Sequence, residues 1–250
     1  MNKPEPIIEF IDVHKSFNDN RVLNGIDLAI YRGETITIMG GSGIGKSVLL
    51  KLLLGLMRPD KGRILFEGKD IAAMDEGELI GIRKKIGMLF QGSALFDSLT
   101  VYENVAYALR EHLNLKEEEI KERVRKKLGL VGLEDVEDKK PAELSGGMKK
   151  RVGLARAIAI EPEVILYDEP TTGLDPTNSR RINSLIKELQ RVLKVTSIVV
   201  THDIKSAYEV SDRIALIYEG RIKKAGAVKD FKSTEDEVVA GFLNGTMESA

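Results

Sequence analysis

A glycine-rich segment of the chain has the residue types that bind phosphate groups. The segment consists of Gly40, Gly41, Ser42, Gly43, Ile44, Gly45, Lys46 and Ser47. Glycines let the backbone turn tightly enough for several N–H groups to point into one hollow, and a following helix adds the positive end of its dipole. The lysine of such a loop reaches the terminal phosphates of a nucleotide, and the serine hydroxyl binds Mg²⁺.

The residues on either side of this segment favour a phosphate loop over a flexible glycine turn. Residues 34–39 read as a β-strand, and residues 48–54 read as a largely buried helix. Strand, loop and helix therefore follow one another in the order that a phosphate loop requires.

Two further predicted strands end in residues that suit the same bound nucleotide. Residues 164–167 lead into Asp168 and Glu169, and residues 197–201 lead into His202. In open parallel sheets, ligands bind beyond the carboxyl ends of the strands. We therefore expect the three strand ends to serve one nucleotide.

The two adjacent carboxylates suit separate tasks in nucleotide hydrolysis. A pair of carboxylates after an apolar strand is costly to bury without a cation. Mg²⁺ bound to phosphate supplies that cation for Asp168, and Glu169 is then free to align and polarise a water molecule for attack on the terminal phosphate. The alternatives are an aspartate that only caps a strand exit and a histidine at the third strand end that only packs.

A second predicted helix start has the features of an anion site. Ser145 is a natural N-cap, and Gly146 and Gly147 leave backbone N–H groups accessible. An ordinary capped helix start is the alternative. The chain has a single phosphate loop, so its own nucleotide already lies at another helix. We therefore expect the helix start at Ser145 to bind the nucleotide of a neighbouring copy, with two copies arranged head to tail around two ATP molecules.

The pattern of apolar residues predicts an α/β fold. Strands are expected at residues 7–13, 22–30, 62–66, 164–167, 196–201 and 213–218, and helices at 178–193 and, interrupted by Pro141, over much of 97–156. A turn is expected at residues 18–20, and a short helical tail from about residue 233. Alternation of strand and helix with continuous apolar runs favours a parallel sheet covered on both faces.

Composition excludes several classes of protein. The 250 residues are 42% hydrophobic, contain no cysteine and carry a net charge of −1, so neither a disulfide framework nor a basic nucleic-acid surface is expected. The longest apolar stretch, residues 48–57, is too short to cross a bilayer, and a cytoplasmic protein is expected. The charged run 116–127 is expected to be a solvated helix with i,i+4 pairs such as Glu117 with Lys121.

These motifs, in this order, resemble those of the ATP-binding subunit of ABC transporters. The resemblance implies a Mg²⁺-dependent ATPase with a P-loop NTPase core, an N-terminal antiparallel β subdomain and an inserted helical subdomain. It covers nearly the whole chain as one domain, residues 1–250. The core is expected at about 1–90 and 160–225, the helical subdomain at about 92–158 and the C-terminal tail at about 226–250.

The resemblance also implies roles for three further residues. Gln91 matches the loop glutamine that senses Mg²⁺ and the attacking water. Asp175 matches the loop that links the two sites across the dimer. Phe17 matches the aromatic residue that stacks on adenine, with ordinary packing as the alternative.

A narrower resemblance is to the ATPases of Mla-type phospholipid-trafficking systems. It rests on residues 43–47, 91–96, 101–107 and 109–112, on Met148 and on the tail segment 242–245. It implies phospholipid transport through integral-membrane permease subunits, an MCE-type lipid-binding protein and a small STAS-like regulatory protein as further partners. It also implies a position on the cytoplasmic face of the inner membrane and contact of the C-terminal extension with a partner subunit.

We expect ATP to close two copies of the protein and hydrolysis to reopen them, with the permease docking on residues 96–100. The nearest alternative is the ATPase of another importer, for amino acids, sugars or metals, whose ATP site would look the same. A non-transport ABC protein acting on DNA or ribosomes would usually carry coiled-coil insertions or two fused ATPase domains. A kinase or GTPase would have no use for the segment at Ser145 or for His202.

Overall fold

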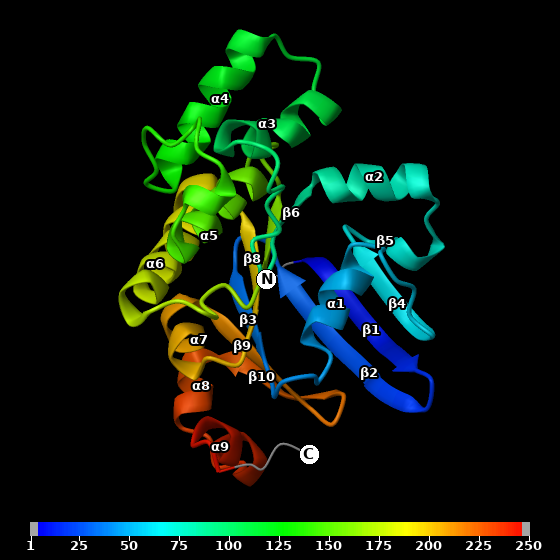
Figure 1. Cartoon of the computed structure of the whole chain (residues 1–250). Helices are drawn as coiled ribbons and strands as arrows, with labels where there is room; N and C mark the ends of the chain where they lie inside the picture. The colour runs from blue at the N-terminus through cyan, green and yellow to red at the C-terminus, as the bar shows by residue number, and fades with distance from the viewer. Residues whose placement is uncertain (1–4, 247–250) are drawn as a thin grey trace. The chain divides into compact units, whose positions relative to one another are not determined.

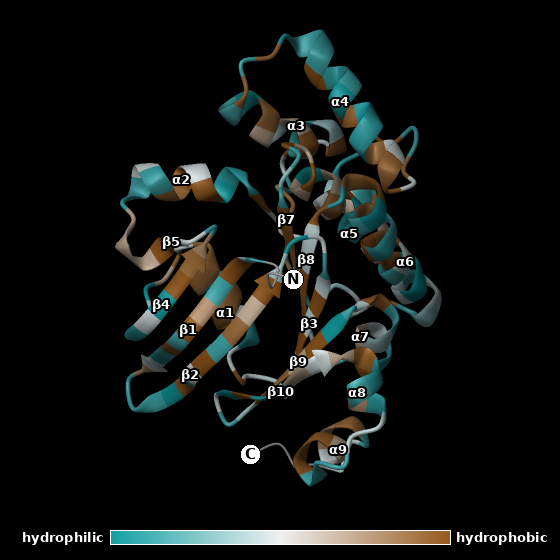
Figure 2. Cartoon of the chain, turned by 180° about the vertical axis from the view of Figure 1, so that it is seen from behind, coloured by the Kyte–Doolittle hydropathy of each residue, from teal (hydrophilic) through white to brown (hydrophobic). Residues whose placement is uncertain are grey.

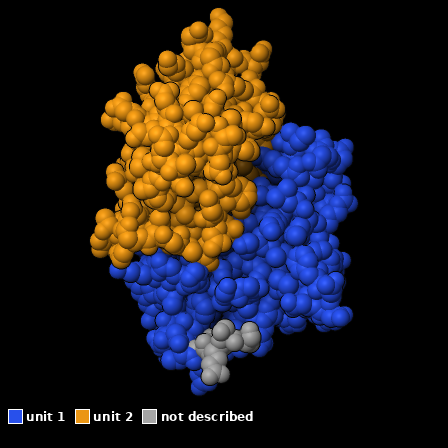
Figure 3. Space-filling model, in the orientation of Figure 1, with its two compact units in different colours: residues 1–83, 196–250 blue, residues 84–195 orange. Residues whose placement is uncertain are grey.

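The computed structural model describes residues 5–246, and the chain divides into two compact units. Unit 1 comprises residues 1–83 and 196–250, and unit 2 comprises residues 84–195 (Figure 3). The residues beyond 246 include the end of the predicted tail, which lies outside the described part of the chain.

Unit 1 contains an antiparallel sheet with the strand order β2-β1-β4-β5 (Figure 1). Its strands are β1 (Pro6–Phe17), β2 (Asn20–Tyr31), β4 (Lys61–Phe66) and β5 (Lys69–Asp70). The turn predicted between the first two strands is present, with Asn18 in the left-handed region at φ 52°. After β5 come the short 3-10 helix η1 (Ile71–Ala73) and α2 (Glu76–Lys84). The predicted strands of this region are confirmed, and the first two extend further than expected.

A second sheet in unit 1 carries the phosphate loop. The strand order in this unit is β10-β9-β3-β8, with β3 (Thr35–Met39), β8 (Thr196–Thr201), β9 (Arg213–Tyr218) and β10 (Arg221–Ala227). The strand β3 lies parallel to both β8 and β9, whereas β10 is antiparallel to β9. All residues of β3 and β8 are buried, because helices cover this sheet and no face needs polar side chains. The helices of this part are α1 (Lys46–Leu53) and α7 (Ile204–Val210).

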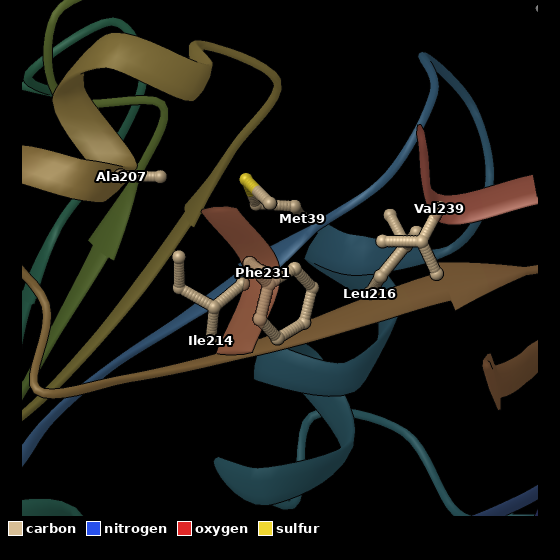
Figure 4. Close-up of a cluster of buried hydrophobic side chains, with 6 residues drawn as sticks. All are labelled: Met39, Ala207, Ile214, Leu216, Phe231 and Val239. Atoms are coloured by element: carbon tan, nitrogen blue, oxygen red, sulfur yellow. The ribbon is translucent and has the colours of Figure 1, made fainter. Parts of the chain in front are cut away.

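Two C-terminal helices complete the core beside this sheet. They are α8 (Val228–Lys232) and α9 (Glu237–Leu243). Phe231 and Val239 are fully buried and form one cluster with Met39, Ile214 and Leu216 (Figure 4). The tail therefore packs against the last residue of β3, directly before the phosphate loop.

Unit 2 combines a parallel strand pair with a group of helices. The pair is β6 (Ile86–Leu89) with β7 (Val164–Asp168). The helices are α3 (Val101–His112), α4 (Glu117–Leu130), the 3-10 helix η2 (Pro141–Glu143), α5 (Gly146–Ala157) and α6 (Pro176–Leu193). Pro141 begins a short 3-10 turn between α4 and α5, and so separates the helices as predicted.

Most residues of the helix α4 are hydrophilic, as the teal of its ribbon in Figure 2 shows. The predicted pairing of Glu117 with Lys121 is wrong. Glu117 instead accepts hydrogen bonds from Tyr102, at 2.7 Å, and from Arg110, both on α3, and so joins two helices. This pairing holds the pKa of the Glu117 carboxyl below its usual value, mainly through the bond from Arg110. None of the helices in residues 5–246 has the length and apolarity that a membrane span requires.

Candidate active site

The phosphate loop is closed by its own lysine. The Lys46 ammonium donates hydrogen bonds of 2.8 Å to the carbonyl oxygens of Gly40 and Gly41 and is only 6% exposed. Gly45, just before α1, has a φ of +102°, and a Cβ there would lie 2.6 Å from Val22. Only glycine fits this position. No side chain caps α1 at this point, so a bound anion suits the N–H groups of its first turn.

The strand register brings His202 to the same edge of the sheet as the phosphate loop. Met39 of β3 pairs with Thr201 of β8, so Gly40 and His202 follow at adjacent strand ends. Asp203, which comes next, caps α7 by accepting hydrogen bonds from two backbone N–H groups of its first turn. His202 itself is exposed. Unit 1 therefore holds the predicted phosphate loop and the predicted histidine side by side.

Phe17 lies at the end of β1 with 40% of its surface exposed. The Lys15 ammonium lies 5.7 Å from the centre of its ring. An exposed aromatic ring at a strand end is available to stack on a planar ligand.

We expect Phe17→Ala to weaken ATP binding by about 0.5–1.5 kcal/mol, because an aromatic contact contributes about that much. Binding of inorganic triphosphate should not change, since it has no base to stack on. Titration calorimetry with both ligands measures the difference. Equal changes for the two would assign Phe17 to packing.

In unit 2, the strand pair places the glutamine loop beside the acidic residues. Leu89 of β6 pairs with Tyr167 of β7, so Gln91 follows one strand, while Asp168 ends the other and Glu169 comes directly after it. Glu169 is only 8% exposed and lies in the left-handed region at φ 45°, which is strained for a residue with a side chain.

The carboxylate of Glu169 is held in place by its own turn. The Thr172 hydroxyl donates a hydrogen bond of 3.1 Å to Glu169 Oε2, and the Thr172 N–H lies 3.3 Å from the Glu169 carbonyl oxygen. An oriented carboxylate is what a residue that aligns water needs.

Lys150 joins these loops, a role that was not predicted for it. Its ammonium donates to the carbonyl oxygens of Gln91, at 2.5 Å, and of Glu169, at 3.2 Å. Burial lowers the pKa of Lys150, and the charges of Asp168 and Glu169 oppose this effect. Its helical spacing from the buried Gly147 and Leu154 was the available signal that it faces inward.

The predicted anion site at α5 has the expected N-cap. Ser145 Oγ accepts a hydrogen bond of 3.3 Å from the Met148 N–H, which leaves the hydroxyl proton available to a phosphate oxygen. Gly146 is exposed, whereas Gly147 is buried against Asn178, where a Cβ would lie 2.6 Å from the amide oxygen.

Asp175 caps the helix α6. Its carboxylate accepts hydrogen bonds from the backbone N–H groups of Thr177, at 2.9 Å, and Asn178, at 3.0 Å. The bonds from Asn178 hold the pKa of this carboxyl below its usual value. The side chain is exposed at the surface of unit 2, as a contact with a neighbouring copy requires.

The donor set predicted for Mg²⁺ consists of oxygen atoms. It comprises the Ser47 hydroxyl in unit 1 and the Gln91 amide and Asp168 carboxylate in unit 2. Oxygen ligands with few protein carboxylates suit Mg²⁺, which usually binds through phosphates and water as well. Within residues 5–246, no group of three or more histidine and acidic side chains is placed so that it could hold a metal ion.

The sequence model of the ABC transporter family matches residues 23–172, more than half of the chain. The chain therefore belongs to the ABC transporter family. It is 34% identical to the ATP-binding cassette MJ0796, solved as a dimer in a post-hydrolysis state with ADP and Pi. That likeness has a TM-score of 0.81 and covers 88% of this chain and 98% of that one. The predicted family and the predicted ABC ATPase fold are confirmed.

Two curated relatives match almost the whole chain. This chain is 42% identical to the probable ribonucleotide transport ATP-binding protein mkl of Mycobacterium tuberculosis. The match extends over 238 residues, or 95% of this chain. The chain spans 66% of the length of that relative, slightly less than two thirds. It is also 41% identical to the intermembrane phospholipid transport system ATP-binding protein MlaF of Haemophilus influenzae, over 96% of this chain and 90% of that protein. The predicted resemblance to Mla-type ATPases is thereby confirmed.

Proposed function

We propose that this protein is the ATP-hydrolysing subunit of an ABC transporter that moves phospholipid through a membrane permease. The observation that carries the ATP-hydrolysing role is the formed phosphate loop, closed by Lys46 and set beside His202 by the pairing of β3 with β8. The phospholipid cargo is supported by the likeness to MlaF. A loop already closed in this way needs little rearrangement to bind a triphosphate.

The residues have distinct tasks in this proposal. Lys46 and the loop N–H groups bind the β- and γ-phosphates, Phe17 stacks on adenine, Glu169 aligns the attacking water and His202 contacts the γ-phosphate. Ser47, Gln91 and Asp168 hold Mg²⁺, which neutralises charge that develops on the phosphates. The division of the chain into a core, a helical subdomain at about 92–158 and a tail from about 226 belongs to the same proposal.

Two copies act together. The dimeric form of the related cassette MJ0796 supports a dimer, and Ser145, Gly146 and Asp175 are exposed at the starts of α5 and α6. In a head-to-tail pair related by a two-fold axis, the hydroxyl of Ser145 is offered to the γ-phosphate bound by the other copy.

Phospholipid is favoured over ribonucleotide as the cargo by the extent of the match. The MlaF relative is matched over 90% of its length, whereas the mkl relative is matched over 66%. The second candidate is the ATPase of another importer, for an amino acid, a sugar or another small solute, because the residues of the ATP site do not depend on which substrate is transported.

We place the permease contact at an apolar groove of about 330 Å³ in unit 2. Phe96 and Tyr107, with 44% and 47% of their surfaces exposed, line it with ring centres 5.2 Å apart. Arg156 stabilises the wall by donating to the carbonyl oxygens of Ala94, at 2.7 Å, and Ser93, at 2.9 Å. A short apolar permease segment fits such a groove.

Further partners follow from the likeness to phospholipid systems. We include an MCE-type lipid-binding protein and a small STAS-like regulatory protein in the proposed assembly, and no nucleic acid. The protein would then lie on the cytoplasmic face of the inner membrane, held there by the permease.

Purification of the tagged full-length protein from membranes tests this proposal. We expect a multi-spanning permease and phospholipid in excess of a mock purification, both identified by mass spectrometry. Tyr107→Glu should reduce recovery of the permease about tenfold or more, because it buries an unpaired charge in the groove. Val192→Glu, at a position of equal exposure on α6, is the matched control. A ribonucleotide, sugar or amino-acid permease without lipid would reject the phospholipid assignment.

A further inference from the structure

Lys150 is a buried cation whose partners are main-chain atoms of two functional loops. The side chain is 4% exposed, and its ammonium bonds to the carbonyl oxygens of Gln91 and Glu169. Burial of an ammonium costs stability unless acceptors compensate for the lost water. An uncharged side chain of similar length would fill the same space. The positive charge of Lys150 therefore indicates that the ammonium group has a function in binding these two carbonyl oxygens.

A hydrogen bond to the Glu169 carbonyl oxygen affects the orientation of the Glu169 carboxylate. It accepts from both Lys150 and the Thr172 N–H, while the carboxylate of the same residue accepts from the Thr172 hydroxyl. The residue lies at φ 45°, so its backbone is strained and must be held by its surroundings. Rotation of this peptide group would redirect the carboxylate.

The helix α5 connects this bond to the predicted contact with the second copy. Ser145 caps the helix, and Lys150 follows five residues later. At about 1.5 Å per residue, the two positions are separated by roughly 7–8 Å of helix. A displacement of the helix start is therefore passed to the ammonium, and from there to the loops of Gln91 and Glu169.

We propose that Lys150 is a positioning residue that makes hydrolysis depend on the engagement of Ser145. It couples the helix start, which contacts the nucleotide of the second copy, to the orientation of Glu169 in its own subunit. This inference rests on the proposed function, because it takes Glu169 as the residue that aligns water. ATP binding does not pass through Lys150 and is independent of it.

The test compares Lys150→Met, Lys150→Arg and Lys127→Met in the full-length protein. Lys127 is a suitable control because it is also a buried lysine of unit 2, 2% exposed, with a 2.9 Å hydrogen bond to Glu161. For Lys150→Met we expect kcat to fall about 10- to 100-fold, since small misplacements of catalytic groups have effects of that size. The Kd for ATP should change less than about threefold. Lys150→Arg, which keeps charged donors, should recover most of the lost rate, and Lys127→Met should retain the normal rate.

A normal kcat in Lys150→Met would overturn the proposal, as would a fall in ATP affinity as large as the fall in kcat. Equal loss in the Met and Arg variants would also overturn it. If Lys150→Met does not fold, Lys150→Gln keeps an uncharged donor of shorter reach and should show an intermediate kcat with normal affinity. Failure of the proposed function is distinguishable, because Glu169→Gln would then also hydrolyse ATP normally.

Discussion

Replacement of Glu169 by glutamine should reduce ATP hydrolysis about 10²–10⁴-fold, which corresponds to about 3–5 kcal/mol of lost barrier reduction. The amide is nearly isosteric, and the Thr172 hydroxyl that bonds to Oε2 at 3.1 Å can still donate to the amide oxygen. The turn should therefore keep its shape while the group loses its capacity to accept a proton. Phosphate release at saturating ATP gives the rate, and titration calorimetry should give an unchanged Kd for ATP.

A control separates this effect from a general effect of removing a carboxylate. Glu188→Gln alters an exposed position on α6 and should hydrolyse ATP at the normal rate. If ATP closes two copies and hydrolysis reopens them, the slow variant should also accumulate as an ATP-bound dimer in size-exclusion chromatography. Normal hydrolysis by Glu169→Gln would remove this residue from the catalytic role.

The parts of the site that were predictable are those whose chemistry is local in the sequence. The loop from Gly40 to Ser47 needs its own glycines and its own lysine, and the structure closes it with bonds between near neighbours. Asp168, Glu169 and His202 follow apolar strands directly, so strand prediction was sufficient to place them at strand ends. Ser145 was predictable as a cap because an N-cap bonds within its own helix.

The parts that were missed depend on contacts between distant residues. Lys150 bonds to carbonyl oxygens 59 and 19 residues away, and no residue type encodes a carbonyl partner. Phe231 and Val239 pack against Met39, which is also far from them in the sequence. A tail expected only to contact a partner subunit thus also supports the strand that leads into the phosphate loop.

Two missed elements had weak patterns. The strand β10 has lysine, glycine and alanine at positions where strands usually carry branched or aromatic residues, and the turn through Glu219 and Gly220, both with positive φ, sets its pairing with β9. The helix α2 has little apolar periodicity. Its start could have been found, because Asp75 and Glu78 form the reciprocal hydrogen bonds of a capping box.

Lys46→Ala should act on binding, in contrast to the effect on rate expected at Glu169. Lys46 is buried, and it both closes the loop through Gly40 and Gly41 and supplies the charge for the phosphates. A charge-assisted bond contributes about 1.5–3 kcal/mol, and loss of the loop closure adds to it, so we expect about 3 kcal/mol, or roughly a hundredfold increase in the Kd for ATP. Lys51→Ala, which removes an exposed lysine of the same helix, should bind ATP normally.

The ligand used in the titration decides what a loss of affinity at Lys46 means. If the lysine binds the terminal phosphates, the loss should be large for ATP and small for AMP, which has no β- or γ-phosphate. An equal loss for both would indicate a collapsed loop, and unchanged affinity for ATP would remove Lys46 from the site. Because Glu169→Gln leaves affinity intact and Lys46→Ala lowers it, the two variants separate the binding step from the chemical step in one protein.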